Sequence, residues 1–386
     1  MRPDPTMVAV VLVLAVGLLA TPWSANHDKQ QPPAGNEQLS GVLGGGAEGE
    51  GFARVTGPRG LDFPADHGAH PDYRSEWWYF TGNLTDAAGR DYGFQLTLFR
   101  FALAPSMPER SSAWATRQAW MGHFAITDIA SGEHVASERL QRGALGLAGV
   151  ASNPFRGWID DWSVRALPEA GEDMFPLRLR AATTAGAVEL TLRSQKPRVL
   201  QGEGGYSPKS DEPGNASHYY SYTRLAAEGR LRTTGAWRPV KGSAWLDREW
   251  STSALAADQA GWDWFALQLT DGRDVMVYRL RGRDGRADKA SYGVVVDAAG
   301  EAAKLGVADF ELTPRRYWTS PATGTRYPIA WRLRIPEHDI DARVEARVDD
   351  QLMDLGFRYW EGSVRVTPGA AGSSVRGVGY LEMTGY

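Results

Sequence analysis

A two-residue alternation of apolar and polar side chains, interrupted by dense turn signals, is the feature that most constrains this chain. Residues 94–98 alternate Phe, Leu and Leu with Gln and Thr, and residues 122–127 and 188–193 follow the same period. Successive strand side chains point to opposite faces, so this pattern indicates half-buried strands. Turn-forming residues such as Asp271-Gly272 separate the strands, and long helical periods are nearly absent. We therefore predict an all-β protein.

One aromatic strand and its turn occur twice. Residues 77–86 carry Trp-Trp-Tyr-Phe and end in Leu-Thr-Asp, with Gly-Arg-Asp at 89–91. Residues 262–271 carry Trp-Asp-Trp-Phe and end in the same Leu-Thr-Asp, with Gly-Arg-Asp at 272–274. The offset of 185 residues (262 minus 77) indicates duplicated domains, each opening with the same hairpin. The alternative is chance similarity between two common hairpins. We predict two tandem β-barrels.

The N-terminus predicts export. Arg2 precedes an apolar run at 7–20, which is short for a membrane-spanning helix and typical of a signal peptide. Trp23 is unfavourable near the cleavage site, so an uncleaved membrane anchor is the alternative. We assign residues 1–25 to a signal peptide or anchor and 26–59 to a flexible linker rich in Gly, Gln and Pro. The two barrels then occupy 60–250 and 251–386, in the periplasm or cell envelope.

Aromatic residues predict a hydrophobic ligand. The chain has 15 Trp, 14 Tyr and 12 Phe, more than core filling alone requires, and such side chains also line apolar pockets. The net charge of only −4 gives no reason to expect nucleic-acid binding. The chain has no Cys, so its stability must come from burial without disulfides. The candidate ligand-binding residues are Trp77, Trp78, Tyr79, His123, Trp262 and Trp264.

Several of these motifs resemble the AttH/CrtC family, which includes carotenoid 1,2-hydratases and secreted AttH-like proteins. The similarity lies in 70–82 (His-Pro-Asp-Tyr-Arg-Ser-Glu-Trp-Trp-Tyr-Phe-Thr-Gly), 153–155, 242–250 and 261–264, and it extends over about residues 60–386. The resemblance implies two lipocalin-like domains. It also implies a carotenoid, terpenoid or other lipid as ligand and, in the hydratase branch, water addition to an alkene without a cofactor or metal.

The resemblance also implies four catalytic residues: His218 and Tyr220, followed by Trp245 and Asp247. Tyr220 stands where the hydratases carry Trp, and Trp245 stands where they carry Tyr, so the resemblance does not identify the substrate. The residue types suit the chemistry. A carboxylic acid buried among apolar groups stays protonated and can protonate an alkene. Aromatic faces stabilise the resulting carbocation, and a histidine can orient the attacking water.

Other interpretations remain open. Asp247 and Glu249 share a strand face and, with Trp platforms, could suggest a glycosidase. The His67 and His70 cluster with Asp66, Asp72 and Glu76 could bind Zn²⁺, although strand entry and capping explain it more simply.

Two functions fit the sequence. One is an enzyme, either a cofactor-free hydratase or a related isomerase or cyclase, and the other is a non-catalytic lipid carrier or sequestering protein. Export favours a carrier, because carotenoid-modifying enzymes work at the cytoplasmic membrane. The spacing of His218 and Asp247 favours an enzyme. The two can be distinguished by whether these two side chains face one cavity.

Overall fold

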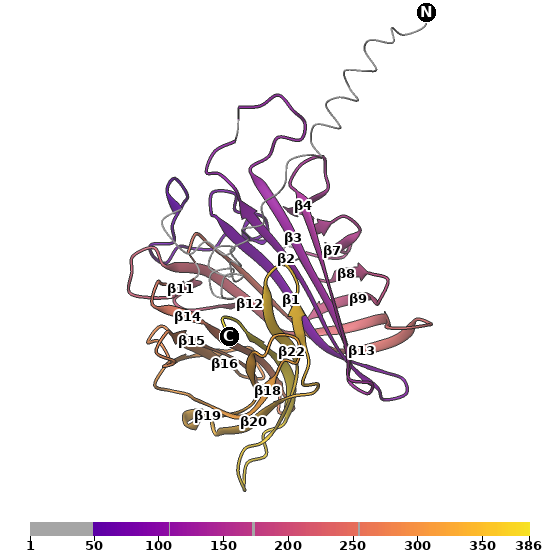
Figure 1. Cartoon of the computed structure of the whole chain (residues 1–386), viewed down its shortest axis with the longest axis vertical. Coiled ribbons are helices and arrows are strands. Elements are labelled where there is room, and N and C mark those ends of the chain that lie inside the picture. The colour runs from indigo at the N-terminus through magenta and orange to yellow at the C-terminus, as the bar shows by residue number, and fades with distance from the viewer. Residues whose placement is uncertain (1–48, 108, 172–173, 254) are drawn as a thin grey trace, which may run out of the picture. The chain divides into compact units, whose positions relative to one another are not determined.

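The computed structural model describes residues 49–107, 109–171, 174–253 and 255–386 (Figure 1). Within these ranges the chain is strands and turns, with two short 3-10 helices, η2 (Ala65–His67) and η3 (Pro336–His338), and no α-helix. No helix in the described ranges is long and apolar enough to cross a membrane. The predicted signal peptide or anchor at 1–25, and most of the predicted linker, lie outside the described residues.

The strands form two antiparallel sheets, which belong to one compact unit. The first sheet has 13 strands and the second has 10. The first contains β1 (Ser75–Asp86), β2 (Asp91–Ala102), β3 (Gln118–Asp128), β4 (Glu133–Arg142), β5 (Ala148–Ser152), β6 (Phe155–Ile159), β7 (Trp162–Ala166), β8 (Leu177–Ala182), β9 (Ala187–Ser194), β10 (Val199–Leu200), β11 (Tyr206–Pro208), β12 (Ala216–Arg232) and β13 (Arg238–Ser251). The second contains β14 (Gln259–Leu269), β15 (Asp274–Gly282), β16 (Tyr292–Val296), β17 (Ala302–Gly306), β18 (Glu311–Thr319), β19 (Arg326–Ile335), β20 (Ile340–Ala346), β21 (Leu352–Asp354), β22 (Arg358–Pro368) and β23 (Gly377–Met383).

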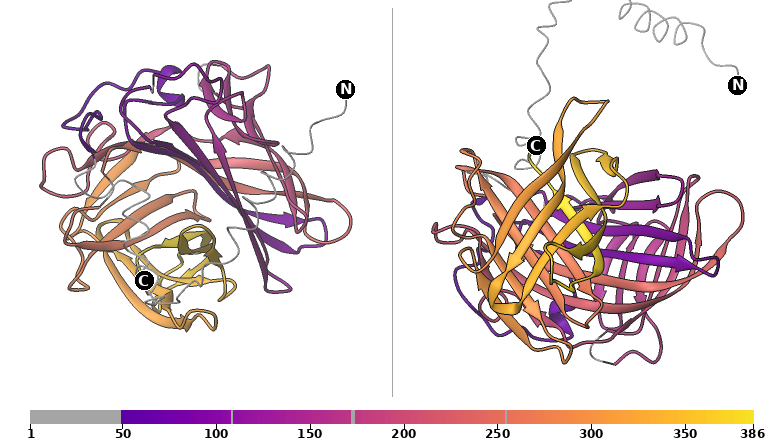
Figure 2. Two further views of the ribbon diagram at one scale, coloured as in Figure 1. Left: turned by 45° about the horizontal axis from the view of Figure 1, so that its top comes forward. Right: turned by 90° about the horizontal axis from the view of Figure 1, so that it is seen from below.

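The two sheets share one topology. In the first, the order β4-β3-β2-β1-β13-β12-β9 joins the first strand of the sheet to its last. In the second, β17-β16-β15-β14-β23-β22 does the same. Both copies of the sequence repeat are hairpins, β1–β2 and β14–β15, at corresponding places in their sheets. The sheets curl strongly (Figure 2), which confirms the predicted all-β fold of two tandem lipocalin-like barrels.

Each curled sheet encloses its own apolar core, and the two-residue period decides which side chains enter it. In β1, Trp78 and Phe80 belong to the first core, while Trp77 and Tyr79 lie on the opposite face. In β14, Phe265 belongs to the second core. Large apolar side chains from most strands fill both cores, so each barrel is a packed body.

The outer faces of the two barrels pack against each other through a third cluster of buried aromatic and aliphatic side chains. Hydrogen bonds cross this interface. Asn83 Nδ2 donates to the Gly379 carbonyl at 3.1 Å, and His123 Nδ1 lies 2.8 Å from the Tyr359 hydroxyl. A Cβ added to Gly93 would lie 2.7 Å from the Tyr380 hydroxyl oxygen, so the sheets approach closely here. The interface is therefore an ordered layer that can position a site.

The described end of the predicted linker is held by the first sheet. The Ala53 amide donates to the Asp72 carbonyl at 2.9 Å, and the Thr252 hydroxyl donates to the Ala53 carbonyl. The Val55 side chain is buried. Residues 49–59 belong to the predicted flexible linker, but the hydrogen bonds of Ala53 and the buried Val55 side chain hold this segment on the barrel.

Candidate active site

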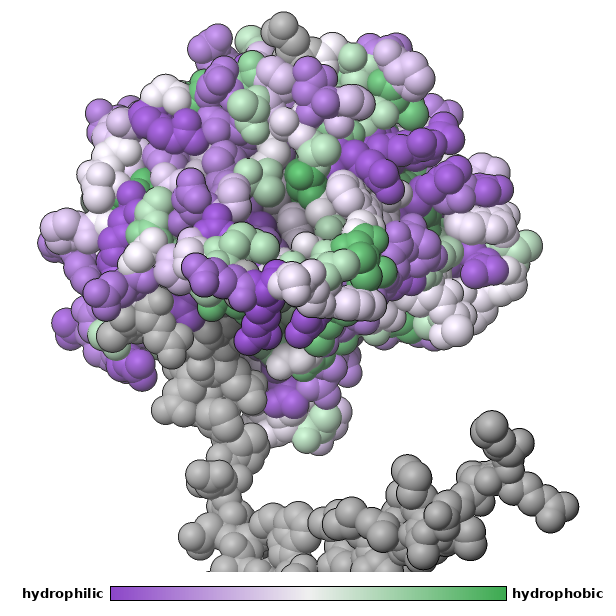
Figure 3. All heavy atoms as spheres, turned by 90° about the horizontal axis from the view of Figure 1, so that it is seen from above, coloured by the Kyte–Doolittle hydropathy of each residue, from purple (hydrophilic) through white to green (hydrophobic). Residues whose placement is uncertain are grey.

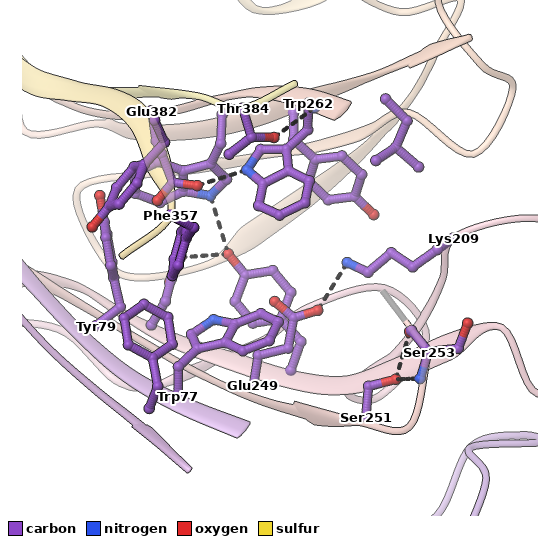
Figure 4. A pocket seen from close by; sticks show the side chains of 17 residues that line it. Trp77, Tyr79, Lys209, Glu249, Ser251, Ser253, Trp262, Phe357, Glu382 and Thr384 are labelled. Atoms are coloured by element: carbon purple, nitrogen blue, oxygen red, sulfur yellow. Dashed lines mark hydrogen bonds and ion pairs between the residues drawn. The ribbon is translucent and has the colours of Figure 1, made fainter. Parts of the chain in front are cut away.

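A half-enclosed pocket of about 100 Å³ lies between the two sheets (Figure 4). Strands β1, β2, β12 and β13 form one wall, and β14, β15, β22 and β23 form the other. Most of the lining is aromatic or aliphatic, with a few carboxyl groups and one lysine. The lining residues are Trp77, Tyr79, Phe99, Lys209, Tyr219, Asp247, Glu249, Ser251, Ser253, Trp262, Trp264, Tyr278, Leu280, Phe357, Tyr359, Glu382 and Thr384.

Asp247 is the buried acid of the first wall. Its Oδ1 accepts hydrogen bonds from the Ser221 hydroxyl at 2.5 Å and from Trp245 Nε1 at 2.7 Å. Its Oδ2 accepts one from the Tyr219 hydroxyl at 2.5 Å. Burial raises the pKa of Asp247 to about 7, although all three hydrogen bonds favour the anion and oppose the rise. A substantial fraction of this carboxyl is therefore protonated at neutral pH.

Glu382, near the end of β23, is the acid of the opposite wall. Its Oε1 accepts a hydrogen bond from Trp262 Nε1 at 2.7 Å, drawn in Figure 4. Burial raises its pKa to about 7, and the charges of Asp247 and Glu249 reinforce the rise. Behind the pocket, burial also raises the pKa of Glu361 well above its usual value. The negative charge of Asp247 is thus one of the causes that keep Glu382 protonated to a higher pH.

An ion pair lies at one end of the pocket. Lys209, which follows β11, places its Nζ 2.9 Å from Glu249 Oε1 (Figure 4). The same Nζ lies 4.6 Å from the ring centre of Tyr278 and 5.5 Å from that of Tyr219. Burial alone would lower the pKa of Lys209, but the Glu249 carboxylate outweighs it and the pKa is raised. The pocket therefore contains an ion pair as well as two carboxyl groups with raised pKa values.

A side chain of the second barrel hydrogen-bonds to a residue that contacts Asp247 of the first. Trp264 Nε1 donates to the Tyr219 hydroxyl at 3.3 Å, and that hydroxyl donates to Asp247. The rings of Tyr79 and Trp264 pack edge to face at 5.2 Å. The Asp247 environment thus requires both members of the sequence repeat, because Tyr79 comes from the first copy and Trp264 from the second.

The structure brings together most of the candidate ligand-binding residues. Four of the candidates line the pocket together with Asp247: Trp77, Tyr79, Trp262 and Trp264. The candidate catalytic residue Trp245 donates a hydrogen bond to Asp247. Two other candidates lie elsewhere. Trp78 is in the first core, because it follows Trp77 on a regular strand. His123 lies in the interface layer, where it also contacts Glu138 at 3.0 Å, and it does not line the pocket.

His218 and Tyr220 are separated from Asp247. Strand β12 pairs Ser221 with Asp247, so the odd-numbered residues from 217 to 221, before the register shift that follows Tyr222, are on the face of the sheet that carries Asp247. His218 pairs with Trp250 and faces the first barrel, where its ring lies 5.4 Å from the Trp250 ring. Burial lowers its pKa to about 4. The four residues implied by the resemblance therefore do not form one site, because the His–Asp spacing places the two side chains on opposite faces of the sheet.

Tyr220 also belongs to the first barrel. Its hydroxyl lies 2.7 Å from Nδ1 of His67, inside the core. It therefore offers no aromatic face to a ligand beside Asp247.

The acidic and histidine cluster before β1 forms an ion-pair network. Glu76 is fully buried and pairs with Arg100 and Arg248, which are also buried. Burial alone would raise the Glu76 pKa, but the two guanidinium groups hold it well below its usual value. The His70 ring stacks on Trp250 with centroids 4.0 Å apart. Arginines thus neutralise these carboxylates, and the cluster stabilises the first barrel.

Sequence reasoning missed three functional candidates: Tyr219, Lys209 and Glu382. Tyr219 lies between two residues that the resemblance singled out, and strand alternation could have placed it with Asp247. Lys209 lies in a loop without a motif. Glu382 lies in the last strand, which pairs with β14, and no local pattern links it to Asp247.

Tandem lipocalin-like barrels with a pocket between them define the class of this protein. A model of the AttH-like family matches residues 54–386, nearly all of the described chain. The chain belongs to the AttH-like family.

Similar structures support this assignment. The crystal structure of an AttH from Nitrosomonas europaea is 34% identical, with a TM-score of 0.77, and the match covers 87% of this chain and 99% of that one. Kievitone hydratase from Nectria haematococca is 15% identical, with a TM-score of 0.62 and coverage of 86% and 97%; this likeness concerns the fold alone.

Among curated proteins, dehydratase asqC of Emericella nidulans is 27% identical over 122 residues. The match covers 30% of this chain and 33% of that protein, so this chain spans about a third of the relative's length.

Proposed function

We propose that this protein is a cofactor-free hydro-lyase that adds water to, or removes it from, an alkene of an apolar ligand held between the two barrels. The observation that carries the proposal is Asp247, a carboxylic acid in an aromatic pocket whose pKa is raised to about 7 by burial, so that a substantial fraction of it is protonated at neutral pH. A carrier has little use for such an acid. The names of two relatives, a hydratase and a dehydratase, support the same class of reaction.

Asp247 supplies the proton. An isolated alkene accepts a proton only from a strong and well-placed acid, and the neutral carboxyl can donate from Oδ2. After transfer, the carboxylate is stabilised at once by the donors already in place, Ser221, Trp245 and Tyr219. These donors need no rearrangement during the reaction, which lowers the free energy of the charged state.

The aromatic walls stabilise the cation. Protonation leaves a carbocation, which is attracted to the faces of aromatic rings. Trp77 and Tyr79 on one wall and Trp262 and Trp264 on the other provide such rings. The same side chains limit the entry of water, so the cation survives long enough to be captured by a positioned molecule.

Glu382 takes the second proton. Water attacks the cation and forms a C–O bond, and a base must then remove a proton from the oxonium product. The Glu382 carboxyl lies on the opposite wall, and a pKa of about 7 leaves it partly ionised at neutral pH. In the forward direction Asp247 loses a proton and Glu382 gains one. Proton exchange with solvent restores both groups, and the same steps in reverse eliminate water.

The pocket size indicates which part of the ligand reacts. A cavity of about 100 Å³ is comparable to engineered cavities that hold a benzene-sized molecule. It suits a branched alkene end group of a polyene or terpenoid-like lipid, with the rest of the ligand extending through the open side. The Lys209–Glu249 pair at one end suits a hydrogen-bonding group on the ligand.

The second candidate function is a non-catalytic lipid carrier of the cell envelope. The observation that favours it is the separation of His218 from Asp247, which removes the site implied by the hydratase resemblance. Export through the N-terminal apolar run, at 7–20, is part of both proposals and is testable by cell fractionation.

Native extraction distinguishes the two functions. The full chain is expressed in its own host, and co-purifying lipids are identified by mass spectrometry. If the protein is an enzyme, the wild type carries a hydrated lipid or its dehydrated counterpart, and Asp247→Asn and Glu382→Gln carry the unconverted partner. We expect at least a 100-fold loss of turnover in Asp247→Asn.

The matched control is His218→Asn, which alters a polar residue of the neighbouring strand that faces away from the pocket. We expect it to retain turnover within a few-fold of wild type. The same unmodified lipid in all four proteins would identify a carrier and contradict the enzymatic proposal.

A further inference from the structure

Large exposed apolar side chains are concentrated at one end of the first barrel. Among the described residues, six large hydrophobic side chains are strongly exposed, and five of them belong to the β2–β3 loop, the end of β4 or the turn after β4. The five are Leu103 (68% exposed), Met107 (57%), Trp114 (52%), Leu140 (66%) and Leu145 (56%). We call these five residues the apolar rim.

The loops that carry the apolar rim are joined to each other. Arg142 Nη1 donates to the Trp114 carbonyl at 3.3 Å, and the Gly143 amide donates to the Gln118 carbonyl at 2.9 Å. The Leu103 amide donates to the Arg117 carbonyl at 2.7 Å. Figure 3 looks onto this end of the molecule, where hydrophobic side chains lie exposed among hydrophilic ones. The rim is therefore one surface made of adjoining loops.

Basic side chains accompany the rim. Arg110 and Arg142 are exposed within the same two loop regions. Exposed Leu, Met and Trp beside arginines form the combination that penetrates the headgroup region of a bilayer, while the arginines attract anionic lipids. Trp in particular favours the boundary between acyl chains and headgroups.

The N-terminal segment enters the described structure beside this rim. The described chain begins at Gly49, and a Cβ added to Gly51 would lie 3.0 Å from Cγ of Pro105 in the β2–β3 loop. The 48 residues before Gly49 contain the apolar run at 7–20. A segment suited to a membrane therefore joins the barrel next to its most exposed apolar loop.

The rim and the pocket lie at the same end of the first sheet. The β2–β3 loop follows the end of β2, close to Phe99, and precedes β3. The pocket lining also includes Trp77 near the start of β1 and Ser251 at the end of β13. The two strands pair at this end of the sheet, with Ser75 opposite Ser251. A ligand that leaves a lipid layer at the rim has a short path to the pocket.

We propose that the apolar rim is a membrane-docking surface that inserts into the interfacial layer of an anionic lipid bilayer. This inference stands independently of the proposed reaction, because a carrier would use the same surface. It assigns a role to side chains that the pocket does not use.

Site-specific fluorescence tests the docking surface in the full chain. The absence of native Cys permits single-cysteine labelling. Met107→Cys carries an environment-sensitive dye in the rim. Ala88→Cys carries it in the exposed β1–β2 turn, at the opposite end of the same strands. Vesicles of equal parts phosphatidylcholine and phosphatidylglycerol should shift the emission at position 107 to the blue, and spin-labelled acyl chains should quench it. Position 88 should not respond.

Both labelled proteins keep the N-terminal run, so binding through that run alone would leave position 107 in water. A blue shift and quenching by spin-labelled acyl chains at position 107, with neither at position 88, support the proposal. Equal responses at the two positions, or none at 107, overturn it and leave the rim as a contact for another protein.

A second variant tests the energetic role of the rim. Leu103→Ser with Trp114→Ser should lower vesicle partitioning roughly tenfold, with unchanged near-ultraviolet circular dichroism to confirm folding. Unchanged partitioning in a folded double variant would also overturn the proposal. Partitioning into pure phosphatidylcholine should be weaker than into the mixture if Arg110 and Arg142 contribute.

Discussion

At the residue scale, two buried carboxyl groups on neighbouring strands have pKa values that are shifted in opposite directions. Glu76 faces two buried arginines, which hold its pKa well below its usual value. Asp247 faces hydroxyl and indole donors and aromatic rings, and burial raises its pKa to about 7. Burial penalises both anions, and only the nearby charges differ. The neighbouring strands β1 and β13 therefore supply a structural ion pair to the barrel and a carboxyl with a raised pKa to the pocket.

Glu76→Gln should be strongly destabilising. The substitution removes the shared counter-ion of Arg100 and Arg248 and leaves two buried guanidinium groups without a carboxylate. We expect a loss of about 3–5 kcal/mol in the free energy of unfolding, measured by urea denaturation. The control Asp284→Asn, at a solvent-exposed pair with Arg286, should change stability by less than about 0.5 kcal/mol. A loss of similar size in both variants would contradict this account of Glu76.

Asp247→Asn should change stability in a pH-dependent way. The folded-state pKa of Asp247 is raised to about 7, so the folded protein holds this proton more tightly than the unfolded chain does. This contribution is fully present below about pH 4 and is lost as the pH rises toward 7. At pH 8 the variant should be more stable than wild type by about 1–3 kcal/mol. At pH 4 the difference should disappear. Parallel denaturation curves at both pH values test this, and a variant less stable at pH 8 than at pH 4, relative to wild type, would refute it.

At the element scale, alternation made the strands predictable from the sequence. The duplicated aromatic hairpins proved to be β1–β2 and β14–β15, and the strands expected around residues 94–98, 122–127 and 188–193 are present. The same alternation explains why His218 and Asp247 do not share a site, although both belong to the matching motifs. His218 and Asp247 lie on adjacent strands, and only the register of β12 against β13 reveals that their side chains point to opposite faces.

Gly93 in β2 keeps the two sheets close. An added Cβ would lie 2.7 Å from the Tyr380 hydroxyl oxygen and 3.0 Å from Ser363 Cβ on the second sheet. Gly93→Val should therefore separate the sheets locally and lower the unfolding free energy by about 1–3 kcal/mol, as overpacking does. It should also weaken binding of an apolar fluorescent probe in the pocket.

The control for this prediction is Gly306→Val in β17, where the nearest atom to an added Cβ is Asp309 Oδ2 at 3.5 Å. Equal effects of the two valines would show that the sheet-to-sheet approach at Gly93 carries no special constraint.

At the scale of the whole molecule, the site exists only because the barrels meet. The sequence predicted the fold, the repeat, the pocket aromatics and Asp247, because these depend on local period or on long motifs. It could not predict Glu382 or Lys209 as neighbours of Asp247, because their meeting depends on how two outer faces dock. Because both barrel cores are packed, the pocket lies between the barrels, and no pattern within a single domain predicts that position.

Asp247 should hold its proton in the pocket up to a pH of about 7. Infrared difference spectroscopy of the full chain between pH 5 and pH 9 tests it directly, with Asp247→Asn and Glu382→Gln as comparisons. A protonated-carboxyl C=O band should disappear with a midpoint near pH 7 and should be diminished in Asp247→Asn. An unchanged band in Asp247→Asn, or a midpoint below about pH 5 for the Asp247 component, near the ordinary range of aspartate, would contradict it.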